Sequence, residues 1–317
     1  MNERLEASQF DNAKGIRNLK ESGTVLDKAL QQELREFSLG EFSDWERNYE
    51  EWKSRLEAER AENPEMQERY QRNIEAARQI TQKLRPCHIT GGEALEHILI
   101  EGRFRPYHEV RSKHQDVRTE TYSSDIALDL DLSTFCGFGK DMHIRQGKQF
   151  IVIFKEETLV RKDTATSLFD AIALYPKESH KAVPADSDIR KLLDTYRKNI
   201  MSGEDMREMM AGVGAANFDN PEEIWDQRKY LPTPWKDRWS PLRSPEVHLV
   251  DPTLDDVEAI AIYADSSYQN TEEIAKRMRG LGKQVIVMDD EYELGDVNEV
   301  NYKLLFEQLD SNQPEQS

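Results

Sequence analysis

The stretch that decides the fold is Pro86–Gly102, which reads PCHITGGEALEHILIEG. Its first part, Cys87–Thr90, alternates between apolar and polar side chains and contains β-branched Ile and Thr, which predicts a short strand. The pair Gly91-Gly92 ends this strand, and the apolar residues within 94–99 then form one stripe of a two-turn helix. Gly102 predicts a left-handed C-terminal cap. The stretch is therefore a strand that turns directly into a helix.

Polar side chains gather at the end of this strand and in the loop after the helix. His88 and Thr90 lie two residues apart, so they point to the same side of the strand and are candidates for a binding site. The loop 103–118 (RFRPYHEVRSKHQDVR) has a formal charge of +3 in a chain of net charge −18. Arg103 and Arg105 are therefore candidates for binding phosphate groups. The alternative is a surface loop whose arginines pair with the acidic remainder.

A later strand begins at a carboxylate. Glu246 opens the run PEVHLV, which predicts a buried strand, and Asp251-Pro252 turns the chain after it. The runs 259–263 and 284–288 predict two more strands, on either side of a helix over 271–281. Earlier apolar runs predict buried strands at 149–154 (QFIVIF) and 171–175 (AIALY).

In this order, the segments resemble the ADP-ribosyltransferases, in particular the DarT-like toxins that modify DNA. His-x-Thr, then Leu-x-x-Ile, then x-Gly is similar to the opening strand and helix of that family, and Glu246 stands where the family has its catalytic glutamate. The order matches across about residues 86–290. The resemblance implies an α+β fold whose core is an ADP-ribosyltransferase-like split mixed or antiparallel sheet. An N-terminal helical region and a helical insertion accompany that core.

The resemblance also implies NAD+ as the substrate and assigns roles to residues. In the family, the opening His and its nearby hydroxyl hold the NAD+ ribose and the nicotinamide edge. Tyr122 and Ser123 fit the second motif best, where an aromatic stacks on nicotinamide and a serine braces the site; Tyr107 is the alternative aromatic. The expected catalytic residues are Glu246, His88 and Tyr122. The expected NAD+-binding residues are His88, Thr90, Gly91, Arg103, Arg105, Tyr122 and Ser123.

The chemistry of NAD+ cleavage explains why such residues are needed. Breaking the bond between nicotinamide and ribose builds positive charge on the sugar, as in glycoside hydrolysis. A carboxylate such as Glu246 stabilises that charge and can take a proton from the incoming nucleophile. No GxGxxG follows a strand and no GxxxxGK[ST] is present, which disfavours hydride transfer and phosphate-loop hydrolysis. The Cys and His positions give no zinc spacing, so no metal is predicted.

The first hypothesis is therefore a mono-ADP-ribosyltransferase toxin that modifies a nucleic-acid base in DNA or RNA. The acidic composition favours a protein acceptor instead, as in an effector that targets proteins. Hydrolysis of NAD+ with water as acceptor is a third possibility. The alternative outside enzymes is a non-catalytic helical interaction protein, in which Trp and Tyr side chains of the N-terminal helices anchor a partner. A toxin of this class also implies an antitoxin or inhibitor protein, for which the N-terminal helices are a plausible contact.

The remaining patterns predict the organisation of the chain. Residues 1–85 have the spacing of helices, with a break at Asn63-Pro64, and form a helical arm or bundle. Residues 86–310 form the ADP-ribosyltransferase-like domain, with a helical insertion at about 186–230 that Gly203, Gly212 and Gly214 interrupt, and 311–317 form a polar tail. Two cysteines indicate a reducing compartment. No run of 18 apolar residues and no signal-peptide core is present, so the expected location is cytoplasmic, without a membrane partner.

Overall fold

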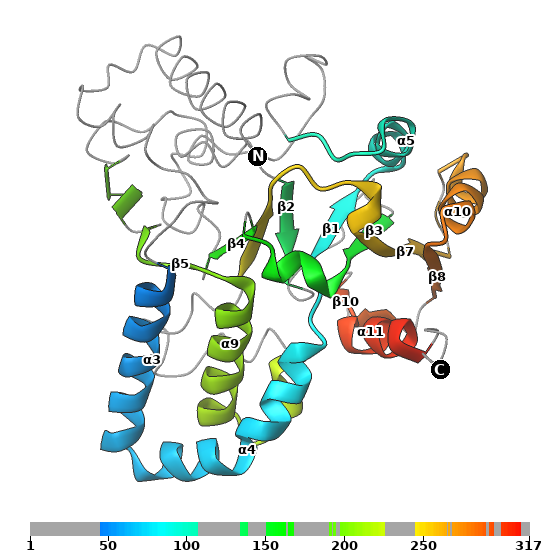
Figure 1. The fold of residues 1–317 in the computed structure, drawn as a ribbon. Coiled ribbons are helices and arrows are strands. Elements are labelled where there is room, and N and C mark those ends of the chain that lie inside the picture. Colours follow the sequence, from blue (N-terminus) through cyan, green and yellow to red (C-terminus); the bar gives the residue numbers. More distant parts are fainter. Residues whose placement is uncertain are drawn as a thin grey trace, which may run out of the picture.

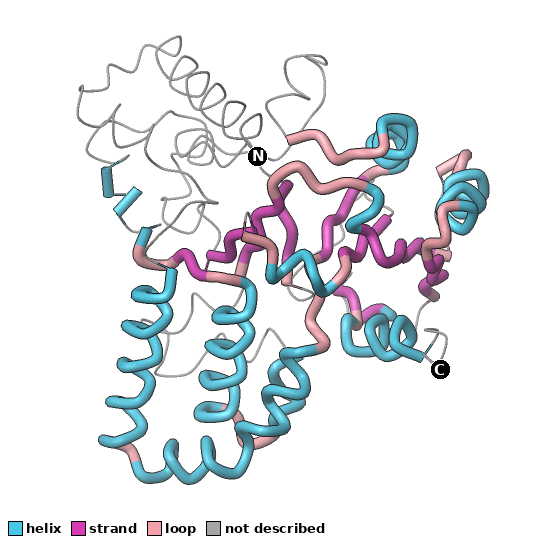
Figure 2. The backbone as a smooth tube through the Cα atoms, viewed as in Figure 1, coloured by secondary structure: helices cyan, strands magenta, loops and turns pink. Residues whose placement is uncertain are grey.

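The computed structural model describes residues 45–106, 134–138, 150–162, 164–167, 190–225 except 192, 195 and 196, 245–289 except 265 and 267, 292–294 and 299–311. These residues form six α-helices and an eight-stranded mixed sheet, so the expected α+β class is confirmed. In Figure 2 the strands form a central band with most of the helices outside it. The predictions for residues 1–44, for a strand at 171–175 and for the tail 312–317 lie outside the described residues.

The main sheet has the order β5-β4-β6-β2-β1-β3-β7-β8 (Figure 1). Its strands are β1 (Cys87–Thr90), β2 (Thr134–Gly137), β3 (Phe150–Phe154), β4 (Thr164–Ser167), β5 (Ile200–Met201), β6 (Glu246–Leu249), β7 (Val257–Tyr263) and β8 (Gln284–Met288). Every neighbouring pair is antiparallel except β7 and β8, which are parallel. A small hairpin of β9 (Glu293–Leu294) and β10 (Glu299–Val300) stands apart.

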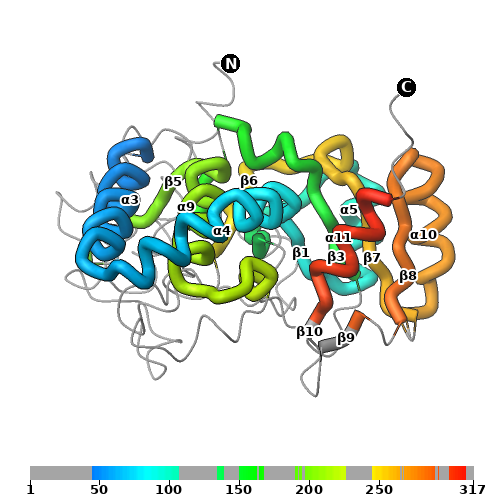
Figure 3. Tube along the Cα trace, turned by 90° about the horizontal axis from the view of Figure 1, so that it is seen from below, coloured from blue at the N-terminus to red at the C-terminus, as the bar shows by residue number. Residues whose placement is uncertain are grey.

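The helices gather at the two ends of the sheet. They are α3 (Trp45–Glu62), α4 (Pro64–Gln82), α5 (Gly92–Glu101), α9 (Gly203–Asn217), α10 (Thr271–Gly280) and α11 (Tyr302–Ser311), with 3-10 turns η2 (Glu156–Val160), η5 (Pro221–Trp225) and η8 (Leu254–Asp256). Seen from below, α3, α9 and α4 lie toward one end and α10, β8 and α11 toward the other (Figure 3). The expected strands at 87–90, 150–154 and 284–288 are confirmed.

The strand-to-helix stretch folds as predicted. β1 is followed by Gly91 as the N-cap of α5, and Gly102 ends the helix in the left-handed region at φ 76°. β1 lies in the middle of the sheet, between β2 and β3, and β3 is buried along its whole length. The short strand is thus placed where the sheet is most shielded from water, with only His88 partly exposed.

The helices α3 and α4 also form where the sequence places them. α3 ends at Glu62, Asn63 caps α4 by accepting a hydrogen bond from the backbone N–H of Met66, and Pro64 occupies the first turn. A proline fits there because its missing N–H has no partner inside the helix. The helical spacing that the sequence shows before residue 63 therefore forms one helix over 45–62, and the predicted break at Asn63-Pro64 is confirmed.

The expectation that glycines interrupt the region 186–230 holds at Gly203, where α9 begins, but it is wrong for Gly212 and Gly214. α9 is one continuous helix that begins at Gly203 and runs through Gly212 and Gly214. A Cβ on Gly212 would lie 3.1 Å from Leu56 of α3, and one on Gly214 would lie 2.6 Å from Ile224 of η5. These glycines let neighbouring elements pack closely against α9, and that burial offsets their poor helix propensity, about 1 kcal/mol each.

A buried cation fixes the entry into β1. Arg85 lies just before the strand with its side chain 10% exposed, and it faces three carboxylates. Its guanidinium nitrogens lie 3.5 Å from Glu258, 3.6 Å from Glu156 and 3.8 Å from Asp310. These acids come from β7, η2 and α11. A buried charge needs such partners, so Arg85 ties three distant parts of the chain to the start of the central strand.

No helix in the described part of the chain has both the length and the apolar character that crossing a membrane requires.

The contact between α5 and Tyr268 gives a test of this packing. An alanine Cβ at position 92 would overlap the Tyr268 ring, whereas a Cβ at Gly280, the last residue of α10, would meet nothing within 4 Å. We expect Gly92→Ala to lower the free energy of unfolding by about 1–3 kcal/mol because of overpacking. Gly280→Ala should leave it unchanged or raise it by up to about 1 kcal/mol. Urea unfolding followed by circular dichroism measures both, and equal midpoints for the two variants would contradict the packing.

Candidate functional site

The strands that carry His88 and Glu246 are both paired to β2. Gly137 of β2 pairs with Cys87 of β1 on one side and with Glu246 of β6 on the other. Neighbouring strands lie about 4.8 Å apart, so the Cα atoms of Cys87 and Glu246 are separated by about 10 Å. The two predicted catalytic residues, more than 150 positions apart in the chain, therefore belong to one small region of the sheet.

His88 bridges the boundary between β1 and β2. β1 and β2 are paired at one position, Cys87 with Gly137, whereas β1 and β3 are paired at four positions. Beyond the single pair, Nδ1 of His88 lies 2.8 Å from the carbonyl oxygen of Phe135 in β2. A carbonyl can only accept, so Nδ1 carries the proton, and in the neutral ring Nε2 is the acceptor nitrogen. The imidazole is thereby fixed in one orientation and one tautomer.

Glu246 sits at the start of β6 among small neighbours. Its cross-strand partners are Gly137 on β2 and Ser167 on β4, and its side chain is 15% exposed. His248, two residues later on the same face, is completely buried, and its Nε2 lies 3.4 Å from Oε2 of the glutamate. The carboxylate thus has a fixed basic neighbour, and no bulky cross-strand side chain flanks it.

The ring of Phe135 links the two halves of the site. It packs edge-on against the ring of His248, with centroids 5.0 Å apart, while its own carbonyl contacts His88. Strand alternation puts the side chains of Phe135, His248 and Glu246 on one face of the sheet. Cys87 shares that face, so the next residue, His88, points to the opposite face. The two predicted catalytic side chains therefore do not meet on one face of the sheet, and β2 lies between their strands.

The beginning of the basic loop is held close to His88. The buried ring of Phe104 lies 6.1 Å from the ring of His88 and 5.0 Å from that of Phe154. The Phe104 N–H donates to the Pro252 carbonyl, the Leu254 N–H donates to the Gly102 carbonyl, and an isolated bridge joins residues 103 and 253. The segment after α5 is thus fastened to the segment after β6, next to the histidine.

The predicted phosphate-binding residues differ in their surroundings. Arg105 is ion-paired with Glu101 through two guanidinium nitrogens, so a phosphate would have to compete with that carboxylate. Arg103 lies in the backbone bridge to Thr253. Thr90 is 5% exposed at the end of β1, and Gly91 follows it as the cap of α5.

Several predicted residues lie outside the described residues. These are Tyr107, Tyr122, Ser123 and the basic residues Arg111, Lys113 and Arg118. In the described part of the chain, the strand between β1 and β6 is formed by 134–137, later in the sequence than the second motif strand expected around Tyr122.

Sequence reasoning overlooked Phe135 and His248. The alternation of Glu246 and His248 in PEVHLV was a usable signal, because residues two apart on a strand share a face. Phe135 carried no such signal, since its importance comes from a strand pairing that the sequence does not reveal.

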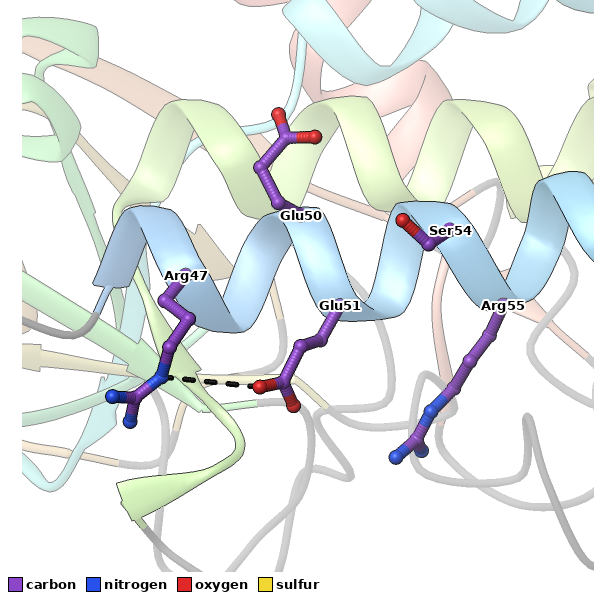
Figure 4. Close-up of a pocket in the computed structure, with 5 residues that line it drawn as sticks. All are labelled: Arg47, Glu50, Glu51, Ser54 and Arg55. Carbon is purple, nitrogen blue, oxygen red and sulfur yellow. Dashed lines mark ion pairs between the residues drawn. The ribbon is translucent and has the colours of Figure 1, made fainter.

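Two other features of the described residues do not add to this site. No group of three or more His, Cys, Asp or Glu side chains there is arranged to hold a metal ion. A pocket runs along α3, lined by Arg47, Glu50, Glu51, Ser54 and Arg55, and Arg47, Glu51 and Arg55 point to the same side of the helix (Figure 4). Arg47 and Glu51 form an ion pair at 3.8 Å, with both side chains more than half exposed. Such surface pairs contribute little to the stability of a protein.

Comparisons of the chain with protein-family models, with curated proteins and with solved structures gave no match. Its function must therefore be inferred from the residues and contacts of the chain itself.

Neither cysteine next to the site has the properties of a nucleophile. Burial raises the pKa of the Cys136 thiol well above its ordinary value, and the nearby charges of Cys87 and Glu246 act in the same direction. Burial also raises the pKa of Cys87. Since the thiolate is the reactive form, a raised pKa and poor access both slow alkylation.

We therefore expect iodoacetamide at pH 8 to leave Cys87 and Cys136 unmodified in the native protein and to modify both in guanidinium chloride. Peptide mass spectrometry measures the two sites separately. Rapid labelling of either thiol in the native state would contradict the burial of β1 or β2.

Proposed function

We propose that this chain is a mono-ADP-ribosyltransferase, which transfers ADP-ribose from NAD+ to a macromolecule. The observation that carries the proposal is the pairing of one strand, β2, with both the His88 strand and the Glu246 strand. This pairing leaves one strand between the two candidates, and the proposal requires NAD+ to reach both side chains around the end of β2, because alternation directs them to opposite faces of the sheet. The ADP-ribosyltransferase-like identity of the sheet is part of the proposal.

In the proposed reaction, the bond between the anomeric carbon of ribose and the nicotinamide nitrogen breaks. The bonding electrons leave with nicotinamide, and positive charge develops on the sugar. The Glu246 carboxylate stabilises this charge and accepts the proton that the acceptor loses as it attacks the same carbon. The products are the ADP-ribosylated acceptor, nicotinamide and one proton. Gly137 and Ser167 favour this role, because small neighbours leave space beside the carboxylate.

His88 is proposed to orient the ribose. Its Nδ1 proton is directed at the Phe135 carbonyl, so the neutral ring offers Nε2 to a ribose hydroxyl as an acceptor. Thr90 and Gly91 follow on the same strand and at the helix cap, where they are proposed to contact NAD+. Arg103 and Arg105 are proposed to bind the pyrophosphate, with Arg105 exchanging Glu101 for phosphate oxygens. Tyr122 and Ser123 keep their proposed roles in the second motif.

A nucleic-acid base is the favoured acceptor, and the protein is then proposed to act as a toxin. The support is the formal charge of +3 of the loop 103–118, together with the contact of its described residue Phe104 with His88. A protein acceptor is the second candidate, because a net charge of −18 disfavours general binding to a polyanion.

The alternative of a helical interaction protein is less well supported. It relied on the aromatic side chains of α3 as anchors for a partner. Trp52, however, donates its indole N–H to the Lys198 carbonyl, and Asn48 donates to the carbonyls of Arg197 and Ile200. This side of α3 therefore binds the segment 197–200 of the same chain. An inhibitor protein would have to bind elsewhere on the N-terminal helices.

The decisive experiment compares Glu246→Gln with the wild type. The protein is incubated with NAD+ labelled in the adenylate part and with a cell lysate that is then divided for nuclease and protease treatment. We expect label that nuclease removes, and a fall of about 10²–10³-fold in its rate of formation in Glu246→Gln, since the amide cannot accept the proton or balance the charge.

Glu57→Gln on the exposed side of α3 is the matched control and should transfer at the wild-type rate. Label removed only by protease would keep the chemistry and change the acceptor. Release of nicotinamide without labelled macromolecule would identify an NAD+ hydrolase. Absence of both label and nicotinamide from the folded wild type would refute the proposal.

A further inference from the structure

We infer that His248 is a positioning residue, which holds the Glu246 carboxylate in its working orientation. The inference rests on the proposed function, because it assigns a role in the same reaction. His248 does not itself need to reach NAD+: it has no exposed surface. Its contribution would be made entirely through the glutamate beside it.

The distance between the two side chains is the first support. Residues two apart on a strand have Cα atoms separated by about 7 Å, and their side chains stand roughly parallel. The Nε2 of His248 and Oε2 of Glu246 are nevertheless only 3.4 Å apart. The glutamate side chain must therefore lean along β6 toward the histidine, which restricts its freedom to rotate.

The restraint on the histidine is the second support. Its ring is held from β2 by the edge-on contact with Phe135, and its register partner on β4 is the small residue Ala165. His248 would carry its proton on Nε2, because a buried N–H requires an acceptor and the carboxylate oxygen lies within ion-pair distance of that nitrogen. The imidazole is thus a rigid neighbour in a dry position, and it limits the rotamers that the partly exposed Glu246 side chain can adopt.

The consequence for catalysis is pre-organisation. A carboxylate that must meet a developing positive charge loses rate when its position is uncertain, and a displacement of about 1 Å can cost about 10²-fold. The Oε2 oxygen of Glu246 faces the histidine, and the carboxylate would meet the ribose or the acceptor from this fixed position. The glutamate would then need no reorganisation at the moment of reaction.

The test uses two substitutions at this position. His248→Phe keeps an aromatic ring that can pack against Phe135 but has no N–H. His248→Gln removes the ring and retains an N–H donor near the place of Nε2. We expect kcat for nicotinamide release to fall about 10²-fold in His248→Phe, with KM for NAD+ within about twofold of the wild type. His248→Gln should recover at least about a tenth of wild-type kcat.

A thermal unfolding measurement accompanies each variant, so that loss of fold is recognised. Wild-type kcat in folded His248→Phe would overturn the inference. So would an equal loss in both variants, since restoring the donor should matter if the donor is the cause.

A readout that needs no activity separates this inference from the proposed function. The Nε2 resonance of His248 is recorded by long-range proton–nitrogen NMR in the wild type and in Glu246→Gln. A shift between the two supports the pairing, and identical resonances overturn it. If the wild type releases no nicotinamide, the proposed function fails, and His248 loses its role in the reaction even where the resonance shifts.

Discussion

The pairing of β2 on both of its edges is the constraint on which the candidate site depends. β1 and β6 are not neighbours in the sheet, and the four residues of β2, 134–137, lie between them. Gly137 lies at the centre of this arrangement, with Cys87 on one side and Glu246 on the other. Because backbone hydrogen bonds fix strand spacing closely, the glutamate and the histidine strand are held at a defined separation without contacting each other.

The same arrangement explains how polar groups survive in a mostly buried region. His88 satisfies Nδ1 at the Phe135 carbonyl, and His248 approaches the Glu246 carboxylate. Burial without partners would be costly for either ring. The apolar surroundings also strengthen electrostatic interactions, which is the condition under which a carboxylate can stabilise positive charge on a sugar most effectively. The fold thus supplies a low dielectric around the start of β6, which would favour the proposed chemistry.

The sequence predicted the local elements well and the long-range pairings poorly. β1, α5 and its Gly102 cap follow from alternation, an apolar stripe and a left-handed glycine, all of which are local effects. The contact between Phe135 and His248 depends on the register of two strands more than 100 residues apart, and local patterns do not encode register. Gly212 and Gly214 of α9 were wrongly predicted to break a helix for a related reason. They are needed for close packing against Leu56 and Ile224, which lie outside α9, and local patterns do not show such contacts.

The buried guanidinium of Arg85 has a consequence for how the chain folds. Its carboxylate partners at 156, 258 and 310 are supplied by segments far along the sequence, and β1 itself pairs with β3 across more than 50 intervening residues. The central strand can therefore not reach its final environment until distant parts of the chain have come together. Folding rates fall as contacts become less local, so assembly of this sheet should be slow compared with formation of the separate helices α3 and α4.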